Sequence, residues 1–191
     1  CCSIVMGTQN MDTGNIEMFL NRFGKQVVNR AKAELGKEKG GNTKLGQSIR
    51  FKVKPDGKGF IVNFYMQDYG EFLDKGVSGT KKEQKFKNLD NQLEISPYSY
   101  TTKGPPIDIL SKWIKKKGIK GHGVKKGRSK DTGQFISGLA YLISRKIKRD
   151  GIKSLSFFQK PLRLGMKQFG KYLLGAIAKD IKDNISKTQV N

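Results

Sequence analysis

Apolar residues recur at three- and four-residue steps near the start of the chain, with charged residues between them. This spacing places the apolar side chains on one face and predicts an amphipathic helix from Asn15 to Leu35. Asp12 or Asn15 can cap its first turn. Gly36 can end the helix, because glycine adopts the left-handed conformation of a helix end at little cost.

The same helical period returns three times in the second half of the chain. Two prolines open a helix over residues 105–118, since proline is tolerated in a first turn, and a second helix is expected over residues 132–151. A last helix begins near Pro161. Its apolar stripe is long and narrow, which suits packing on a sheet or on neighbouring subunits, and it consists of Leu162, Met166, Phe169, Leu173, Ile177, Ile181 and Ile185.

A period of two marks the region after the first helix. Apolar and polar residues alternate over residues 48–54 and again over 60–64, with a Pro-Asp-Gly-Lys-Gly turn between them, which predicts a β-hairpin over residues 48–65. Residues 65–79 then form a short helical turn closed by two glycines. Residues 80–104 are polar and weakly periodic, which favours a long loop or an excursion from the domain.

These elements together predict an α+β fold with about four helices. A small antiparallel sheet is packed by the N-terminal helix and the long C-terminal helix, and a helical, lysine-rich region is inserted at about residues 80–133. We expect a flexible tail over residues 1–10 and a single domain over residues 11–191. Only 36% of the 191 residues are hydrophobic, below the roughly 45–50% of ordinary globular chains, so part of the chain is expected to lie outside any core.

The strong positive charge of the chain is the feature of the sequence that says most about its partners. The chain carries a formal net charge of +22, and nine positive side chains occur between positions 112 and 130 with no acidic residue among them: Lys112, Lys115, Lys116, Lys117, Lys120, Lys125, Lys126, Arg128 and Lys130. A solvated basic loop is one interpretation of this cluster. Contact with the phosphates of DNA or with an acidic protein surface is the other, and the sequence does not rank those two partners.

The side chains needed for catalysis or for a metal site are few. One His and two adjacent cysteines, Cys1 and Cys2, cannot build a zinc site of three or four ligands without help from several carboxylates. Asp68, Glu71 and Asp74 share one helical face and could hold a divalent cation, although pairing with nearby lysines is the simpler expectation.

Other motifs point the same way. Gly118 and Gly123 have the spacing of a phosphate-binding loop, but Val124 follows in place of Lys and Ser or Thr, and His122 lies isolated between glycines. We therefore expect no enzyme activity, no metal and no cofactor. No apolar run reaches the length of a secretory core or of a membrane span, so synthesis in the cytoplasm and no membrane contact are expected.

Four segments, taken in order, resemble the head-to-tail joining proteins of tailed bacteriophages, the neck and tail-completion group of minor structural proteins. They are the aromatic-acidic-glycine segment 69–76, the proline-to-tryptophan helix 105–114, the helix 138–147, and the entry to the last helix at 157–162. Lys75 before Gly76, and Ser156-Phe157 before Phe158, depart from the family pattern. The residues that carry the resemblance are Tyr69, Glu71, Gly76, Pro106, Trp113, Phe158 and Pro161.

The resemblance implies a non-enzymatic virion subunit made in the host cytoplasm. Such a subunit forms a ring of 6 or 12 copies in the neck or tail, between the portal and the tail or other ring proteins, where its basic side chains could also meet the DNA backbone. The rival function is a nucleic-acid protein that binds the backbone irrespective of sequence, because no base-reading motif is present. A third function, a nuclease, would depend on the three carboxylates at 68, 71 and 74.

Overall fold

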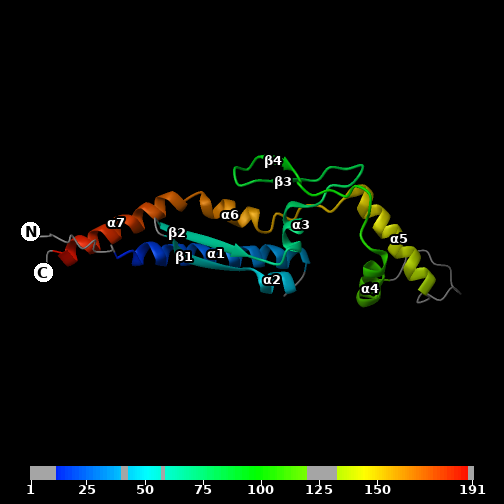
Figure 1. Cartoon of the computed structure of the whole chain (residues 1–191), viewed down its shortest axis with the longest axis horizontal. Helices are drawn as coiled ribbons and strands as arrows, with labels where there is room; N and C mark the ends of the chain where they lie inside the picture. The colour runs from blue at the N-terminus through cyan, green and yellow to red at the C-terminus, as the bar shows by residue number, and fades with distance from the viewer. Residues whose placement is uncertain (1–11, 40–42, 57–58, 120–132, 189–191) are drawn as a thin grey trace, which may run out of the picture. The chain divides into compact units, whose positions relative to one another are not determined.

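The structure is a computed structural model, and it describes residues 12–39, 43–56, 59–119 and 133–188. The predicted α+β class is confirmed, with seven helices and two small antiparallel sheets in the described residues (Figure 1). The chain divides into two compact units, and unit 2, Asp68–Ser156, is inserted between the two parts of unit 1, Cys1–Gln67 and Phe157–Asn191. The insertion is therefore wider than the arm expected over residues 80–133.

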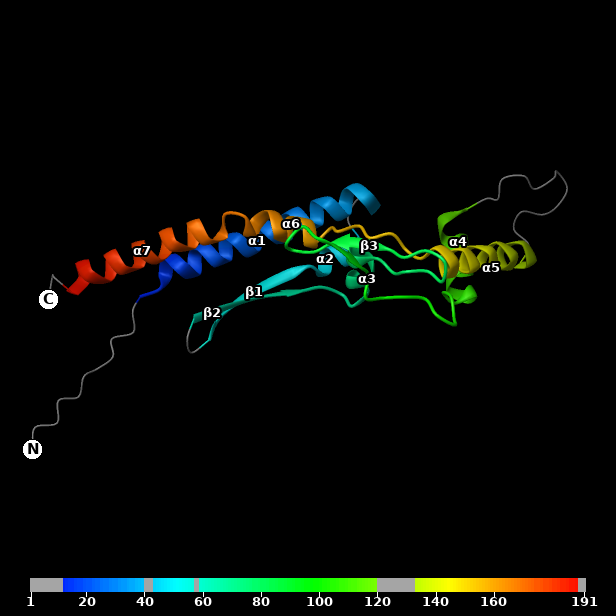
Figure 2. The same cartoon turned by 90° about the horizontal axis from the view of Figure 1, so that it is seen from above.

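Unit 1 is built around its first helix. Its elements are α1 (Gly14–Lys39), α2 (Lys44–Ser48), β1 (Arg50–Asp56), β2 (Gly59–Tyr65), α6 (Gln159–Met166) and α7 (Phe169–Thr188). Helix α1 contacts both strands, α2, α6 and α7, and Figures 1 and 2 show α7 alongside it. The buried residues of α1 repeat at helical spacing as the sequence predicts: Leu20, Phe23, Val27, Val28, Ala31 and Leu35.

The hairpin lies where the alternating pattern places it, and its prediction is confirmed. Strands β1 and β2 pair antiparallel from Arg50 opposite Tyr65 to Asp56 opposite Gly59. Its inner face packs on α1 so closely that a Cβ atom at Gly24 would overlap the Phe51 ring. Glycine at position 24 is thus what lets the helix lie against the sheet.

Two helix ends differ from the prediction. Helix α1 does not end at Gly36 but continues to Lys39. Glycine inside a helix costs only about 1 kcal/mol, and the burial of Leu35 together with the Glu34–Lys37 ion pair stabilises the helix around it. A helix can therefore run through a glycine that looks like a stop.

The last helix is also two helices rather than one. Helix α6 ends at Met166 and α7 begins at Phe169, with glycines at 165 and 170 flanking the break. Gly165 lies against Phe23, and the Phe169 ring meets the Phe23 ring edge-on at 4.8 Å. The apolar period continues across both helices, which is why the sequence pattern does not reveal the break.

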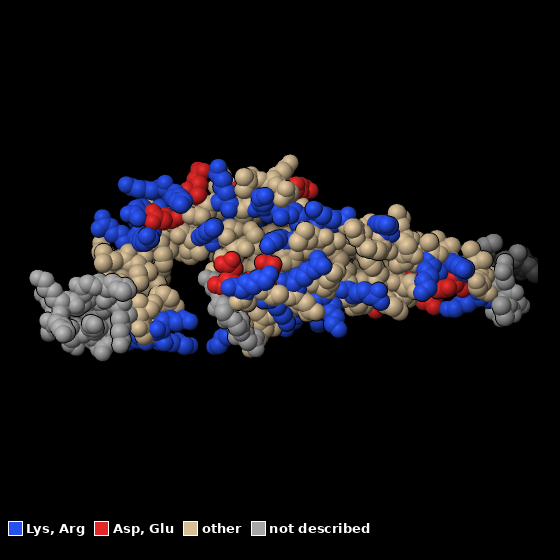
Figure 3. Space-filling model, turned by 180° about the vertical axis from the view of Figure 1, so that it is seen from behind, with Lys and Arg blue, Asp and Glu red and all other residues tan. Residues whose placement is uncertain are grey.

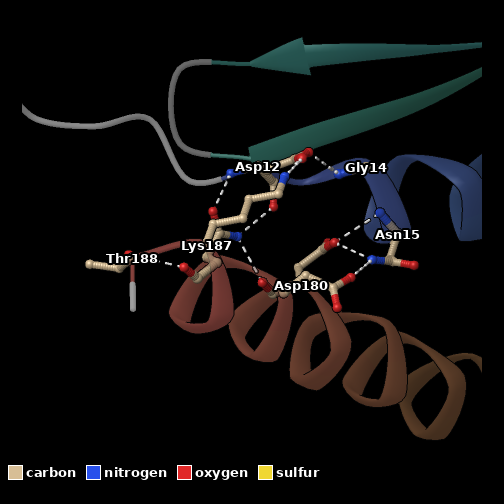
Figure 4. A network of polar contacts seen from close by, with 8 residues as sticks. Asp12, Gly14, Asn15, Asp180, Lys187 and Thr188 are labelled. Carbon is tan, nitrogen blue, oxygen red and sulfur yellow. Dashed lines mark hydrogen bonds and ion pairs between the residues drawn. The ribbon is translucent and has the colours of Figure 1, made fainter. Parts of the chain in front are cut away.

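A buried carboxylate links the two ends of unit 1 (Figure 4). Asp180 of α7 is 2% exposed and accepts hydrogen bonds from the main-chain N–H groups of Asn15 and Ile16 and from the Asn15 side chain. Burial alone would raise the pKa of Asp180, but these bonds outweigh it and hold its pKa below the ordinary value. The start of α1 is therefore capped by a side chain from the far end of the sequence.

Unit 2 contains α3 (Tyr69–Lys75), β3 (Lys85–Lys87), β4 (Leu93–Ile95), α4 (Ile107–Lys117) and α5 (Gly133–Asp150). Region 80–104 is not a plain loop but carries the β3–β4 hairpin, closed by a turn in which Asn88 bonds Gln92. Its strands are only three residues long, and Leu93 and Ile95 are exposed. Phe86 on β3 is the one buried residue of the two strands, so the sequence shows no repeating inward-facing pattern there.

The centre of unit 2 is a crossing of main chains. Val77 exchanges hydrogen bonds with Ile152, and Ser78 with the stretch from Tyr98 to Tyr100. Gly151 has a φ of +77°, and a Cβ there would overlap the Val77 carbonyl oxygen. The predicted stop of the 132–151 helix at Gly151 is confirmed, and the same glycine makes the crossing possible.

Helices α4 and α5 pack as a pair. Ile114 and Ala140 are buried between them, with Leu110, Ile119, Leu139 and Ile143 around them. Gly118 ends α4, as the sequence predicts. It adopts the left-handed conformation, and its N–H bonds the Lys115 carbonyl oxygen. No helix in the described part of the chain is both long and apolar enough to cross a membrane.

Candidate functional site

The lysine cluster begins on the exposed face of α4. The side chains of Lys112, Lys115, Lys116 and Lys117 are all exposed, whereas Ile114 among them is buried against α5. None of these four forms an ion pair with another described residue. Three of them occupy the last helical turn, where positive charge is favoured by the helix dipole.

The remainder of the cluster lies outside the described residues, and so do the lone histidine and both cysteines: Lys120, Lys125, Lys126, Arg128, Lys130, His122, Cys1 and Cys2. The structure therefore places four of the nine predicted contacts together on one helix. Across the face drawn in Figure 3, basic side chains also predominate over acidic ones.

The acidic segment on α3 is arranged differently from a cation site. The Glu71 carboxylate accepts a hydrogen bond from the Tyr98 hydroxyl, and the Tyr98 ring meets the Phe72 ring edge-on at 4.5 Å. The bond to Glu71 raises the pKa of Tyr98, because it stabilises the protonated phenol. The partner of Glu71 is thus a tyrosine, where the sequence led us to expect a lysine.

No group of three or more His, Cys, Asp or Glu side chains that could hold a metal occurs among residues 12–39, 43–56, 59–119 and 133–188. Asp74, the third carboxylate, is buried at 3% exposure, while Asp68 is exposed. The equal sequence spacing of the three residues therefore does not bring them together as one open ligand set.

The residues that carry the family resemblance lie in both units. Tyr69 and Trp113 are exposed, Gly76 has a φ of +78° where it ends α3, and Pro106 directly precedes the first residue of α4. At the entry to α6, Pro161 is buried. Next to it, the Phe158 ring meets the Phe64 ring at 5.3 Å, so this motif anchors α6 on the hairpin.

A groove that sequence reasoning missed runs along unit 1 between α1 and the α6–α7 pair. It has a volume of about 810 Å³, and its floor carries Phe19, Phe23 and Phe169. Among the described residues, the polar side chains of its lining are basic, amide-bearing or phenolic, with no carboxylate: Asn15, Arg22, Gln26, Arg30, Gln168, Lys171, Tyr172 and Lys179. Its two walls are more than a hundred residues apart in sequence, so no local pattern could indicate it.

Helix α7 also carries a second apolar stripe that faces away from α1. Leu174 is 67% exposed, Ile181 43% and Ile185 55%, and Ala178 is exposed between them. The spacing of four, three and four residues places all four on one side of the helix. We call these four residues the outer stripe.

Neither known protein families, nor curated proteins, nor solved structures provide a match to this chain.

Proposed function

We propose that the chain is a non-enzymatic, ring-forming structural subunit of a tailed-phage virion, located in the neck or tail between the portal and the tail. The observation that carries the proposal is the outer stripe of α7. Single exposed apolar residues are ordinary on protein surfaces, but an aligned row of them on one helix is typical of an interface. A ring of identical subunits, 6 or 12 in number, would cover this row on every copy.

Two further features support the same proposal. Leu93 and Ile95 on the short strand β4 are 68% and 54% exposed, so a second apolar surface is open to a neighbour. The four ordered sequence motifs resemble neck and tail-completion proteins, and Pro161 and Phe158 hold the α6 entry as a packed structural element. The portal and adjoining tail proteins are the proposed heterologous partners.

Native mass spectrometry of the full chain tests the ring. We expect a closed oligomer of one defined size, and we expect Leu174→Glu combined with Ile185→Glu to reduce it to monomers, because charge is costly in a buried apolar contact. Ser186→Glu is the control for added charge, since it places one glutamate at an exposed site on the same helix away from the stripe, against two in the test variant. A wild-type chain that stays monomeric at every concentration would contradict the proposal.

A second candidate function is binding to the nucleic-acid backbone, which is favoured by the four lysines on α4 that pair with no described carboxylate. Binding of this kind is sequence-independent and weakens steeply with salt. Affinity for a DNA duplex that does not change between low salt and about 200 mM would exclude it.

A further inference from the structure

The outer face of the β1–β2 hairpin carries a row of cations that the sequence cluster at 112–130 does not include. Phe51 and Val53 face α1 and are half-buried, so the alternate residues Arg50, Lys52 and Lys54 point outward and are exposed. Side chains two residues apart on a strand lie on the same face, about 6.7 Å apart. The three charges therefore form a straight, evenly spaced line, which we call the hairpin row.

Neutral side chains stand opposite the hairpin row. The register sets Arg50 against Tyr65, Lys52 against Asn63 and Lys54 against Ile61. The Arg50 guanidinium lies 5.6 Å from the centre of the Tyr65 ring, and none of the three cations forms an ion pair with a described residue. The nearest acidic residue in this line of the strand is Asp56, at the end next to the turn.

Protection of the sheet edge does not account for such a row. Charged side chains on an edge strand discourage edge-to-edge pairing, but three like charges along one face of the hairpin also repel one another without a counter-charge. Among the described residues, no carboxylate of another element pairs with a cation of the hairpin row. The positive charge of this face is therefore available to a ligand outside the chain.

We propose that the hairpin row binds the phosphate backbone of duplex DNA. A duplex carries regularly spaced phosphates, with an axial rise of about 3.4 Å per phosphate on each strand, so each of three outward cations spaced about 6.7 Å apart can meet a phosphate. The regular line of charge matches a regular polyanion better than it matches the irregular surface of an acidic protein. Contacts of this kind position DNA without reading its sequence.

The ligand is the same as in the second candidate function, but the face is a different one, so either can fail alone. The hairpin row also makes no use of the outer stripe of α7. A chain that forms rings and does not bind DNA, or one that binds DNA as a monomer, would therefore separate this inference from the ring proposal.

Fluorescence anisotropy with a labelled mixed-sequence DNA duplex tests the row. The row variant is Arg50→Gln, Lys52→Gln and Lys54→Gln together. The matched control is Lys25→Gln, Lys32→Gln and Lys153→Gln, which removes the same charge from three scattered, exposed positions. A third variant, Arg50→Lys with Lys52→Arg and Lys54→Arg, keeps the charge, and far-ultraviolet circular dichroism verifies that each variant is folded.

Each phosphate contact contributes about 0.9 to the slope of log affinity against log salt, so losing three lowers the slope by about 2.7. Between about 50 and 200 mM salt the wild type should then lose about 40-fold more affinity than the row variant. The scattered control and the charge-keeping variant should retain the wild-type slope. Equal slopes for the row variant and the scattered control would overturn the proposal, and so would absence of duplex binding by the wild type at low salt.

One outcome would show that the hairpin row contacts protein and not DNA. A row variant that keeps the duplex slope but loses self-association in native mass spectrometry would place the hairpin row in a protein contact. That result overturns the DNA proposal while leaving the ring proposal standing.

Discussion

Units 1 and 2 bury different kinds of group at their centres. Unit 1 buries a continuous set of apolar side chains, to which α1 alone contributes six, together with Leu45, Ile49 and Phe157. Unit 2 buries few apolar side chains outside the α4–α5 pair, and its centre is the crossing of main chains at Val77 and Ile152. The stability of unit 1 should therefore be most sensitive to the loss of side-chain volume. The stability of unit 2 should be most sensitive to a Cβ atom added at a glycine of the crossing.

The sharpest test of this contrast is a cavity in unit 1. Phe157 is completely buried, so Phe157→Ala should lower the free energy of unfolding by about 3–5 kcal/mol in urea denaturation. Phe72→Ala in unit 2 is the control and should cost less, because Phe72 is 42% exposed and its stack on Tyr98 adds only about 0.5–1.5 kcal/mol to the area that it buries. Similar losses for the two variants would remove the distinction between the units.

A methyl group tests the crossing in unit 2. Gly151→Ala should cost about 3 kcal/mol, since the left-handed conformation costs about 1–2 kcal/mol and the contact with the Val77 carbonyl adds about 1–3 kcal/mol. Gly118→Ala separates the two causes, because Gly118 is also left-handed but a Cβ there meets nothing within 4 Å. It should cost only about 1–2 kcal/mol, and thermal unfolding of both variants measures the difference.

Gly24 in unit 1 should be as intolerant of an added methyl group as Gly151 in unit 2. Gly24→Ala places a Cβ against the Phe51 ring and should cost about 1–3 kcal/mol. Gly36→Ala in the same helix has open space around it and should stabilise the chain by about 0.5–1 kcal/mol, because alanine is the better helix former. If both changes stabilised the protein in urea denaturation, the close approach of α1 to the hairpin would be disproved.

The contrast also explains what the sequence could predict. Helix α1, with Phe23 and Val27, buries one face, and so does the hairpin, with Phe51. The spacing of their apolar residues in the sequence therefore shows the period of 3.6 of a helix and the period of 2 of a strand. Strand β4 exposes Leu93 and Ile95, and the crossing at Val77 depends on main-chain bonds, which leave no periodic trace. Local pattern therefore predicted most of unit 1 and only the helices of unit 2.

The candidate surfaces divide in the same way. The lysines of α4 form a run in the sequence. The predicted stripe of the last helix includes Ile181 and Ile185 of the outer stripe but not Leu174 or Ala178, and these four separate from the residues packed on α1 only when the contact between α1 and α7 is known. Similarly, Arg50, Lys52 and Lys54 look ordinary in the sequence of an exposed strand. Their significance comes from the register, which sets neutral residues opposite all three.

The smallest effect concerns the polar contact that closes unit 1. Asp180→Asn should cost about 1 kcal/mol at neutral pH, because the charged acceptor for the Asn15 and Ile16 N–H groups is lost. The pKa of Asp180 is lowered in the folded chain, so its stabilisation is fully present above the unfolded value of 3.8 and is lost as pH falls through the lower, folded value. The wild type and Asp180→Asn should therefore converge in stability in that acidic range.

Salt distinguishes this buried contact from its exposed neighbour. Asp12 pairs with Lys187 at 2.7 Å, and that hydrogen bond likewise holds the pKa of Asp12 low, but both side chains are largely exposed (Figure 4). The effect of Asp12→Asn should shrink in about 1 M salt, because exposed ion pairs are screened. The effect of Asp180→Asn should persist, since its partners are N–H groups at a shielded site. If salt abolished both effects in urea denaturation at neutral pH, Asp180 would be acting as a surface charge and not as the buried cap of α1.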